Sequence, residues 1–328
     1  MNTFSNYPVD AVIAWVDGWD ENHQKKILPF LSDKKIISNK NFRTRFDQVE
    51  EIKYTVDSIL KFAKFIRNIY IVTDNQIPKF LKNEDTLHKY NNVKIIDHSL
   101  IFEDQYSYLP VFNCRSIETR LYKIPNLSEY FIYFNDDMFL IKETKSEDFF
   151  VEGFPIIRGK WFQLNEDNLL KKIFSSKKNK TRAGHKIAQQ KGAKIIGFRK
   201  YYKFEHTPYP FRKSTFIDFF KENKEVEMNN IKYRFRNINQ FTPQSLINHI
   251  EIKNGTCKLE SDYKMVYFQN YKKPFIWIKF KLLNSTKNTE KLFLCMQSLD
   301  QCSEKKLRFI KKWLSNKYDW FVRFNFTN

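Results

Sequence analysis

Four short apolar runs are separated by amphipathic segments over the first 140 residues of the chain. They cover residues 9–16, 68–73, 93–96 and 130–140, and each is followed or interrupted by polar side chains. Runs without polar alternation are typical of strands buried on both faces, and helices between such strands produce β-α units. The pattern therefore predicts an α/β fold, Rossmann-like, with a mostly parallel central sheet flanked by helices.

Helical periodicity appears in four segments: 48–65, 113–124, 241–250 and 304–314. In the first of these, Ile52, Val56 and Ile59 recur at spacings of three and four residues, which is typical of an amphipathic helix.

Residues 171–200 are dense in lysine and show little periodicity. We expect an exposed loop there, either closing over substrate or touching a membrane, although such a run is usually only a solvated face. The chain then reads as a single domain, 1–328, with an α/β core (1–145), a basic insertion (146–205) that contributes helix to the fold, and a C-terminal part with helices (206–328).

The chain is strongly basic, because 57 Lys and Arg against 37 Asp and Glu give a net charge of +20. This charge indicates an anionic partner, which could be nucleic acid, an acidic lipid surface or a phosphorylated substrate. The chain has no zinc-finger, basic-zipper or RNA-recognition signature, so we expect no nucleic acid. It also has no apolar run of the ~20 residues that span a bilayer, and its four cysteines lack metal spacing. We therefore expect reduced cysteines in a cytoplasmic protein, either soluble or peripheral on the inner face of the cell membrane.

Asp136 and Asp137 follow the most apolar run. Ligands of open α/β sheets bind outside the carboxyl ends of the strands, where a carboxylate pair can hold Mg²⁺ or Mn²⁺ against a diphosphate. Since neighbours in an extended chain point to opposite faces, at most one of the two acids need be a direct ligand. An acidic turn after a strand is the alternative.

Further candidates stand at other element ends. Asp17 and Gly18 follow the first run, either as a ligand site or as a plain turn, and Asp10 at its start holds either the backbone or a nucleotide. Arg45, ahead of the first helix, is placed to hold a diphosphate. His206 stands on a stiff backbone between aromatic residues and two prolines, while His98, near another strand end, is expected to be structural.

Several of these stretches occur in an order that resembles a known family, the Stealth proteins. The matching residues are Asp10, Trp15, Asp17 and Gly18; Arg45, Glu50 and Tyr54; 67–78, which includes Asn75 and Gln76; Leu109, Pro110 and Phe112; 131–138; and His206, Thr207, Pro208 and Arg236. The family comprises bacterial capsular polysaccharide phosphotransferases and the catalytic subunit of the animal enzyme that puts N-acetylglucosamine 1-phosphate on lysosomal glycoproteins.

The resemblance implies a glycosyltransferase-A-like fold and a nucleotide-sugar donor. A sugar 1-phosphate would be moved to a glycan or phosphoglycan acceptor, with release of UMP. Asp136 and Asp137 would hold the metal, Arg236 the phosphoryl oxygens, and His206 the proton. The implied substrate-binding residues are Asp10, Trp15, Asp17, Gly18, Arg45, Asn75 and Gln76.

Two departures from the family pattern stand out. Asp57 takes a position where the family usually has Arg, and the last block reads 295–298 as Cys-Met-Gln-Ser, so no site residue is expected there. Two alternatives stay open: a glycosyltransferase that releases UDP, and a non-catalytic basic module that binds a membrane or polymer.

Overall fold

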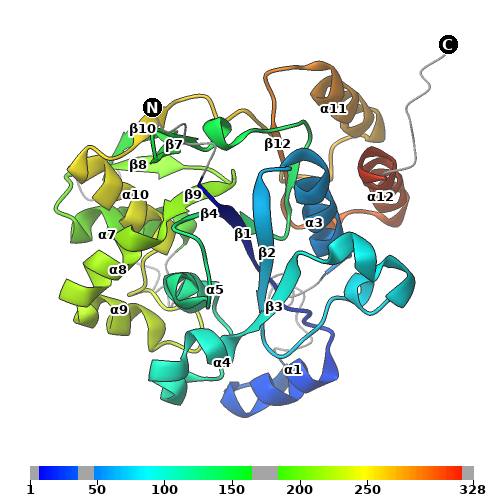
Figure 1. The fold of residues 1–328 in the computed structure, drawn as a ribbon. Coiled ribbons are helices and arrows are strands. Elements are labelled where there is room, and N and C mark those ends of the chain that lie inside the picture. The colour runs from blue at the N-terminus through cyan, green and yellow to red at the C-terminus, as the bar shows by residue number, and fades with distance from the viewer. Residues whose placement is uncertain (1–6, 36–47, 165–183, 320–328) are drawn as a thin grey trace, which may run out of the picture.

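A five-stranded sheet lies at the centre of the protein (Figure 1). The computed structural model describes residues 7–35, 48–164 and 184–319. The sheet has the order β3-β2-β1-β4-β9, and only its edge strand β9 runs antiparallel. Its strands are β1 (Val9–Ala14), β2 (Ile66–Thr73), β3 (Val93–Asp97), β4 (Tyr130–Asn135) and β9 (Tyr209–Arg212). The predicted α/β fold with a mostly parallel sheet is confirmed.

The register of the parallel strands brings their carboxyl ends to one edge of the sheet. Ala14, the last residue of β1, pairs with Asn135 of β4 and with Val72 of β2. Side chains of β4 are almost fully buried, as the unbroken apolar run predicted. The polar residues that follow each strand therefore gather at this edge.

Helices cover both faces of the sheet, with α3 on one side and α5 on the other in Figure 1. The predicted helices are present as α3 (Glu51–Phe62), α5 (Cys114–Thr119), α10 (Pro243–Asn254) and α12 (Glu304–Tyr318). Further helices are α1 (Glu21–Ile27), α4 (His98–Ile101), α7 (His185–Ile195), α8 (Lys213–Glu222), α9 (Lys224–Ile231) and α11 (Phe275–Lys287).

Two smaller sheets flank the central one. The three-stranded sheet β11-β12-β5 consists of β11 (Met265–Phe268), β12 (Phe293–Met296) and β5 (Met138–Leu140). The other contains β6 (Phe150–Val151), β7 (Phe154–Gln163), β8 (Lys200–Phe204) and β10 (Lys258–Glu260). Because β5 follows β4 after two residues, the first small sheet adjoins the acidic turn directly. All four cysteines are free, as predicted.

In the lysine-rich stretch 171–200, the described part forms a helix, as predicted for a helical insertion, and not the expected exposed loop. Its first part, up to residue 183, lies outside the described residues, but the remainder forms α7 and the start of β8. Helix α7 packs closely on α10: a Cβ at Gly192 would meet the backbone N of Leu246 at 2.7 Å. Small and amide side chains make this contact, so hydrophobic periodicity could not reveal the helix.

Candidate active site

A cavity of about 310 Å³ opens at the carboxyl edge of the central sheet. The four predicted catalytic residues, Asp136, Asp137, His206 and Arg236, all line it. Trp15, which directly follows β1, also lines the cavity. Four separate parts of the chain thus meet around one space.

The two acids sit in the turn between β4 and β5, which neighbouring elements hold from both sides. Thr55 on α3 donates its hydroxyl to the carbonyl of Asp136 at 2.6 Å. On the other side, the backbone N–H of Met296 in β12 donates to the carbonyl of Asp137 at 3.0 Å. The side chain of Gln48 donates to Asp136 Oδ2 at 2.8 Å. The position of the pair is therefore fixed by the fold rather than by a ligand.

Burial makes ionisation of these acids unfavourable. It raises the pKa of Asp136 to about 7, and the charge of Asp137 adds to the effect. Burial also raises the pKa of Asp137 to about 6 and that of the neighbouring Glu51 to about 8, where the charge of Asp136 contributes. Asp136, Asp137 and Glu51 are thus buried close together. Such a cluster favours a bound cation, because a cation stabilises the ionised forms of the acids.

The acid pair fits a divalent cation of the Mg²⁺ type. Asp137 Oδ1 is buried and has no hydrogen-bond partner among the described residues, so one carboxylate oxygen is available to a ligand. In the described parts of the chain, no group of three or more His, Cys, Asp or Glu side chains could hold a metal by itself. Mg²⁺ commonly binds one or two carboxylates together with substrate phosphates and water, and Asp136 and Asp137 would supply the carboxylates of such a set.

His206 is held between two other rings. His185 at the start of α7 stacks on it at 5.2 Å between centroids, and Tyr267 of β11 stacks at 5.9 Å. Nδ1 of His206 is buried without a hydrogen-bond partner in the described residues. Burial lowers the pKa of this imidazole, and the charges of Lys203 and Arg236 act in the same direction. At neutral pH the ring is therefore uncharged and can accept a proton.

Arg236 reaches the cavity from the segment between α9 and α10. The backbone N–H of Phe112 donates to the carbonyl of Arg234 at 2.8 Å, so the two segments run together. Arg236 Nη2 lies 2.9 Å from Cys114 Sγ at the start of α5. On the same short helix, Arg115 and Glu118 also line the cavity. Arg236 is solvent-exposed, which suits a cation that meets an incoming anion.

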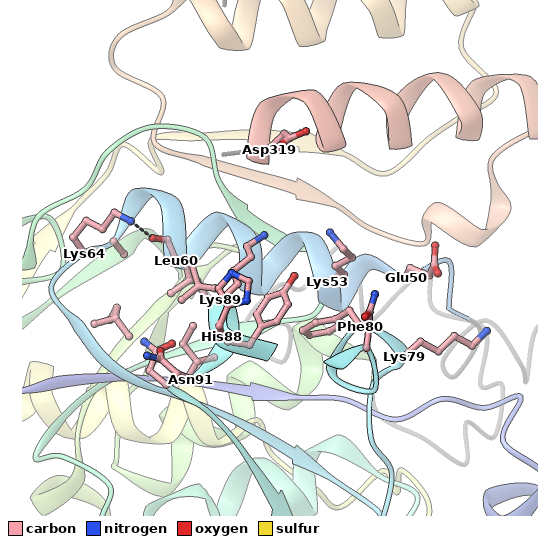
Figure 2. Close-up of a pocket in the computed structure, with 17 residues that line it drawn as sticks. Glu50, Lys53, Leu60, Lys64, Lys79, Phe80, His88, Lys89, Asn91 and Asp319 are labelled. Atoms are coloured by element: carbon pink, nitrogen blue, oxygen red, sulfur yellow. Dashed lines mark hydrogen bonds between the residues drawn. The ribbon is translucent and has the colours of Figure 1, made fainter. Parts of the chain in front are cut away.

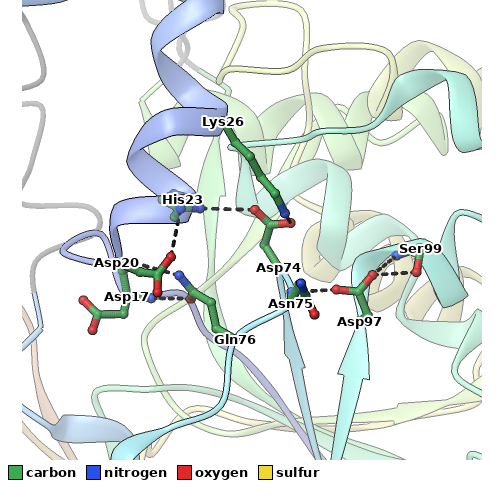
Figure 3. A network of polar contacts seen from close by, with 9 residues as sticks. All are labelled: Asp17, Asp20, His23, Lys26, Asp74, Asn75, Gln76, Asp97 and Ser99. Atoms are coloured by element: carbon green, nitrogen blue, oxygen red, sulfur yellow. Dashed lines mark hydrogen bonds and ion pairs between the residues drawn. The ribbon is translucent and has the colours of Figure 1, made fainter.

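A polar network joins the loops at the ends of β1, β2 and β3 (Figure 3). Gln76 accepts from the backbone N–H of Asp17 at 2.7 Å and donates to its carbonyl at 3.0 Å. The backbone N–H of Asn75, a residue with φ of 53°, donates to Asp97 Oδ2 at 2.6 Å. The predicted residues Asp17, Asn75 and Gln76 thus fix loop shape, and none of them lines the cavity.

Gly18 belongs to the same loop, where its carbonyl accepts from Gln24 at 2.9 Å. The network reaches the cavity through His23, which pairs with Asp74 at 3.2 Å and lines the cavity itself. Although burial raises the pKa of Asp74, the hydrogen bonds from His23 and Lys26 hold it below its usual range. This loop is therefore a charged, ordered rim beside the cavity.

Asp10 lies away from the cavity, at the opposite end of β1. It is fully buried and accepts hydrogen bonds from Arg67 at 2.7 and 3.0 Å and from the backbone N–H of Ser128 at 2.8 Å. Of the two roles considered for it, the structure favours holding the backbone over holding a nucleotide. Arg45, the other predicted anion-binding residue, lies outside the described residues.

The chain has a larger cavity, of about 860 Å³, along the other side of α3 (Figure 2). Four lysines line it: Lys53, Lys64, Lys79 and Lys89. Two of them, Lys53 and Lys89, pair with the buried Asp57 at 2.7 and 2.5 Å, and Tyr90 donates to the same carboxylate. Asp57, the departure from the family pattern, therefore joins α3 to the segment before β3. The described lining contains none of the four predicted catalytic residues, so we place the chemistry in the smaller cavity.

Several cavity residues escaped sequence analysis. No site residue was assigned in the last block, yet Gln297 of that block lines the cavity and the Cys295 thiol hydrogen-bonds to Asp137. His98, expected to be structural, also lines it. Other polar residues that line the cavity and were not singled out include Gln48, Asn113, Arg115, Glu118, Tyr133, His185, Tyr209 and Gln244. Of all these missed residues, Tyr133, Cys295 and Gln297 lie in family blocks, and that position could have marked them in advance.

Comparisons with known proteins found a matching family and similar sequences. Residues 45–156 match the family described as Stealth protein CR2, conserved region 2. The capsular polysaccharide phosphotransferase fcs1 of Haemophilus influenzae is 36% identical over 73% of this chain and 63% of its own length. The capsular polysaccharide phosphotransferase cps1A of Actinobacillus pleuropneumoniae is 31% identical over 88% of this chain and 76% of its own length.

Among solved structures, galactosyltransferase LgtC in complex with donor and acceptor sugar analogues is similar with a TM-score of 0.39. It is 10% identical, and the match covers 88% of this chain and 86% of that one; a likeness of this size carries no argument about activity. The sequence matches are stronger evidence. They confirm the resemblance found in the motifs, and the chain belongs to the Stealth family.

Proposed function

We propose that this protein transfers a sugar 1-phosphate from a nucleotide sugar to a glycan hydroxyl, in the synthesis of a capsule or another surface polysaccharide. The observation that carries the proposal is that Asp136, Asp137, His206 and Arg236 line one cavity. The names of the relatives, capsular polysaccharide phosphotransferases, support the reaction class. The donor class would be a UDP-hexose or UDP-N-acetylhexosamine, and such a donor would place the reaction in the cytoplasm.

In the proposed reaction, an acceptor hydroxyl oxygen attacks the phosphorus atom that carries the sugar. A new P–O bond forms while the bond from this phosphorus to the bridging oxygen breaks, so UMP leaves and a phosphodiester remains. Nδ1 of His206 takes the proton of the hydroxyl, for which its lowered pKa leaves it unprotonated at neutral pH. Arg236 stabilises charge on the phosphoryl oxygens.

Asp136 and Asp137 would hold a Mg²⁺ or Mn²⁺ ion, which when bound would neutralise charge on the diphosphate. Their raised pKa values and the buried, unpartnered oxygen of Asp137 support this assignment. Gln48 and Thr55 keep Asp136 oriented. Arg115 adds a second guanidinium to the same wall as Arg236.

The products distinguish this proposal from its two rivals. The purified protein would be incubated with Mg²⁺, a panel of UDP-sugars and oligosaccharide acceptors, and the nucleotides separated by anion exchange. Acceptor-dependent release of UMP supports sugar-phosphate transfer. Release of UDP would instead mean that the sugar C–O bond breaks, as in a glycosyltransferase. If binding of the polysaccharide occurs while neither nucleotide is released with any donor, the protein is a non-catalytic module.

A further inference from the structure

Helix α11 has apolar side chains on two opposite faces. Its inner face is buried. Ile278 and Leu282 belong to an apolar cluster that also contains side chains of β12 and α12, and the small Ser285 is buried on the same face. On the outer face Ile276, Phe280 and Leu283 are 70%, 62% and 47% exposed. Because these three residues are spaced by four and three positions, they form one stripe along the helix.

The helix lies at the edge of the molecule beside α12 (Figure 1). Large apolar side chains exposed singly are ordinary, but a contiguous exposed stripe marks an interaction surface. Trp277, 37% exposed, borders the stripe. Its ring packs edge-on against Phe268 of β11 at 5.9 Å, so it is fixed where the apolar stripe meets the polar surface.

The chain segment that contains α11 carries charge of one sign. Residues 263–289 contain no Asp or Glu and six lysines, namely Lys264, Lys272, Lys273, Lys279, Lys281 and Lys287. Four of these, Lys272, Lys273, Lys279 and Lys287, are exposed. An apolar stripe bordered by lysines is the pattern of helices that lie in the plane of a membrane surface.

We propose that α11 binds the surface of an anionic lipid bilayer. Ile276, Phe280 and Leu283 enter the boundary between headgroups and acyl chains, and the lysines contact the anionic headgroups. Trp277 lies at headgroup level, where Trp is enriched in membrane proteins. The contact is peripheral: within the described residues, no helix has the length and hydropathy needed to cross a membrane.

Charge favours a bilayer over a second copy of this chain as the occupant. In a two-fold symmetric dimer the same surface faces itself, so the lysines around α11 would meet the same lysines with no acid of this segment between them. An anionic bilayer instead complements the whole set. Strand β11 connects this surface to the cavity. Phe268 of β11 packs against Trp277, and the adjacent Tyr267 stacks on His206.

The test is co-sedimentation of the full chain with lipid vesicles at low salt. One vesicle set contains phosphatidylglycerol in phosphatidylcholine, and the other contains phosphatidylcholine alone. We expect binding to the anionic set only, lost at high salt. The triple variant I276S/F280S/L283S should bind roughly a thousand-fold more weakly, because each of the three large apolar side chains contributes roughly a factor of ten when buried. K279Q and K287Q should each weaken binding about five-fold.

The matched control is L100S/I217S/L259S, which removes three apolar side chains of 47%, 41% and 40% exposure from other elements. It should bind vesicles as the unchanged protein does. Circular dichroism and UMP release with a water-soluble acceptor should be unchanged in both triple variants, which separates this surface from the proposed chemistry. Equal vesicle binding by I276S/F280S/L283S would overturn the proposal. So would a dimer, seen by light scattering, that this variant dissociates while the unchanged protein binds no vesicles.

Discussion

Gln48 donates a hydrogen bond of 2.8 Å to Asp136, a residue 88 positions further along the chain. The same side-chain nitrogen donates to the carbonyl of Val16 at 3.1 Å. One amide group thereby joins the segment after β1 to the acidic turn after β4. The carboxylate of Asp136 is thus oriented before a metal or donor arrives, and such outer contacts set how well a ligand can bind.

Loss of this hydrogen bond should weaken metal binding. We expect Gln48→Ala to raise the Mg²⁺ concentration for half-maximal activity about ten-fold, and to lower kcat about ten-fold, the usual lower range for such contacts. A Mg²⁺ titration of UMP release measures both values. Gln301→Ala is the matched control, since Gln301 is exposed and does not line the cavity. If Gln48→Ala keeps both values, the orientation of Asp136 does not depend on this contact.

His206 and Arg236 should act in the chemical step. We expect His206→Ala and Arg236→Ala each to lower kcat by ~10²-fold or more, the scale of one catalytic group, while donor affinity changes far less. His88→Ala serves as the control because His88 is exposed and lines the other cavity; His98 is unsuitable, since it lines the same cavity as His206. Near-normal kcat in His206→Ala would remove the proton-transfer role.

Metal dependence should vary with pH. Burial and the charge of Asp137 raise the pKa of Asp136 to about 7, and burial raises that of Asp137 to about 6. Since a metal binds the ionised forms, the Mg²⁺ requirement should rise as pH falls from 8 to 5.5, by up to ~10-fold per pH unit for each proton displaced. EDTA should abolish UMP release, and added Mg²⁺ should restore it. Full activity in EDTA or in Asp137→Ala would contradict the assignment.

The raised pKa values of Asp136 and Asp137 also affect folding. Without metal, they should make the folded state more stable at low pH, whereas metal binding is favoured at high pH. A carboxyl group whose pKa is higher in the folded state stabilises the fold below its unfolded value, near 4, and this stabilisation is lost as pH rises through 6 to 7. Without metal, the unfolding temperature should therefore fall over this range. Asp137→Asn should unfold a few degrees higher than the unchanged protein at pH 8, and Mg²⁺ should stabilise only the unchanged protein. Differential scanning calorimetry with and without EDTA would check this.

The central sheet was predictable because its strands are buried on both faces. In β4 every residue from 131 to 134 is apolar and buried, and the parallel register then places the following acids at one edge. That reasoning required no contact between distant residues. His206 was a candidate from its stiff, aromatic-flanked backbone, and the family resemblance supplied the roles of His206 and Arg236. The fold brings both to the cavity that the acids line.

The remainder of the site depends on tertiary packing that leaves little trace in sequence. His185 stands at the start of α7, a helix that packs through alanines, amides and Gly192 rather than through an apolar stripe. Glu118 is buried on a six-residue helix, where Tyr133 of β4 donates to it at 3.0 Å. Neither residue lies in a recognisable sequence motif. Each can be identified as part of the site only when its neighbours in the folded structure are known.

Asp10 shows the limit of reading a role from a motif position, because its place in the family pattern suggested a ligand. Arg67 and the backbone N–H groups of Asn68 and Ser128 all donate to its carboxylate. Although burial raises the pKa of Asp10, these donors lower it below its usual range. The carboxylate therefore stabilises the fold above pH 4, and this stabilisation is lost as the pH falls through the lowered pKa.

We expect Asp10→Asn to lower the free energy of unfolding by ~2 kcal/mol, since it removes the charge of a buried carboxylate paired with the half-exposed Arg67 and leaves donors without acceptors. Urea unfolding at pH 7 measures this loss, and the difference from the unchanged protein should shrink in acid as the native carboxylate becomes protonated. Asp218→Asn is the control because Asp218 is exposed. Donor affinity per folded molecule should be unchanged, since Arg67 and Ser128 already use the carboxylate. A variant of normal stability whose donor affinity falls would instead mean that Asp10 contacts the nucleotide.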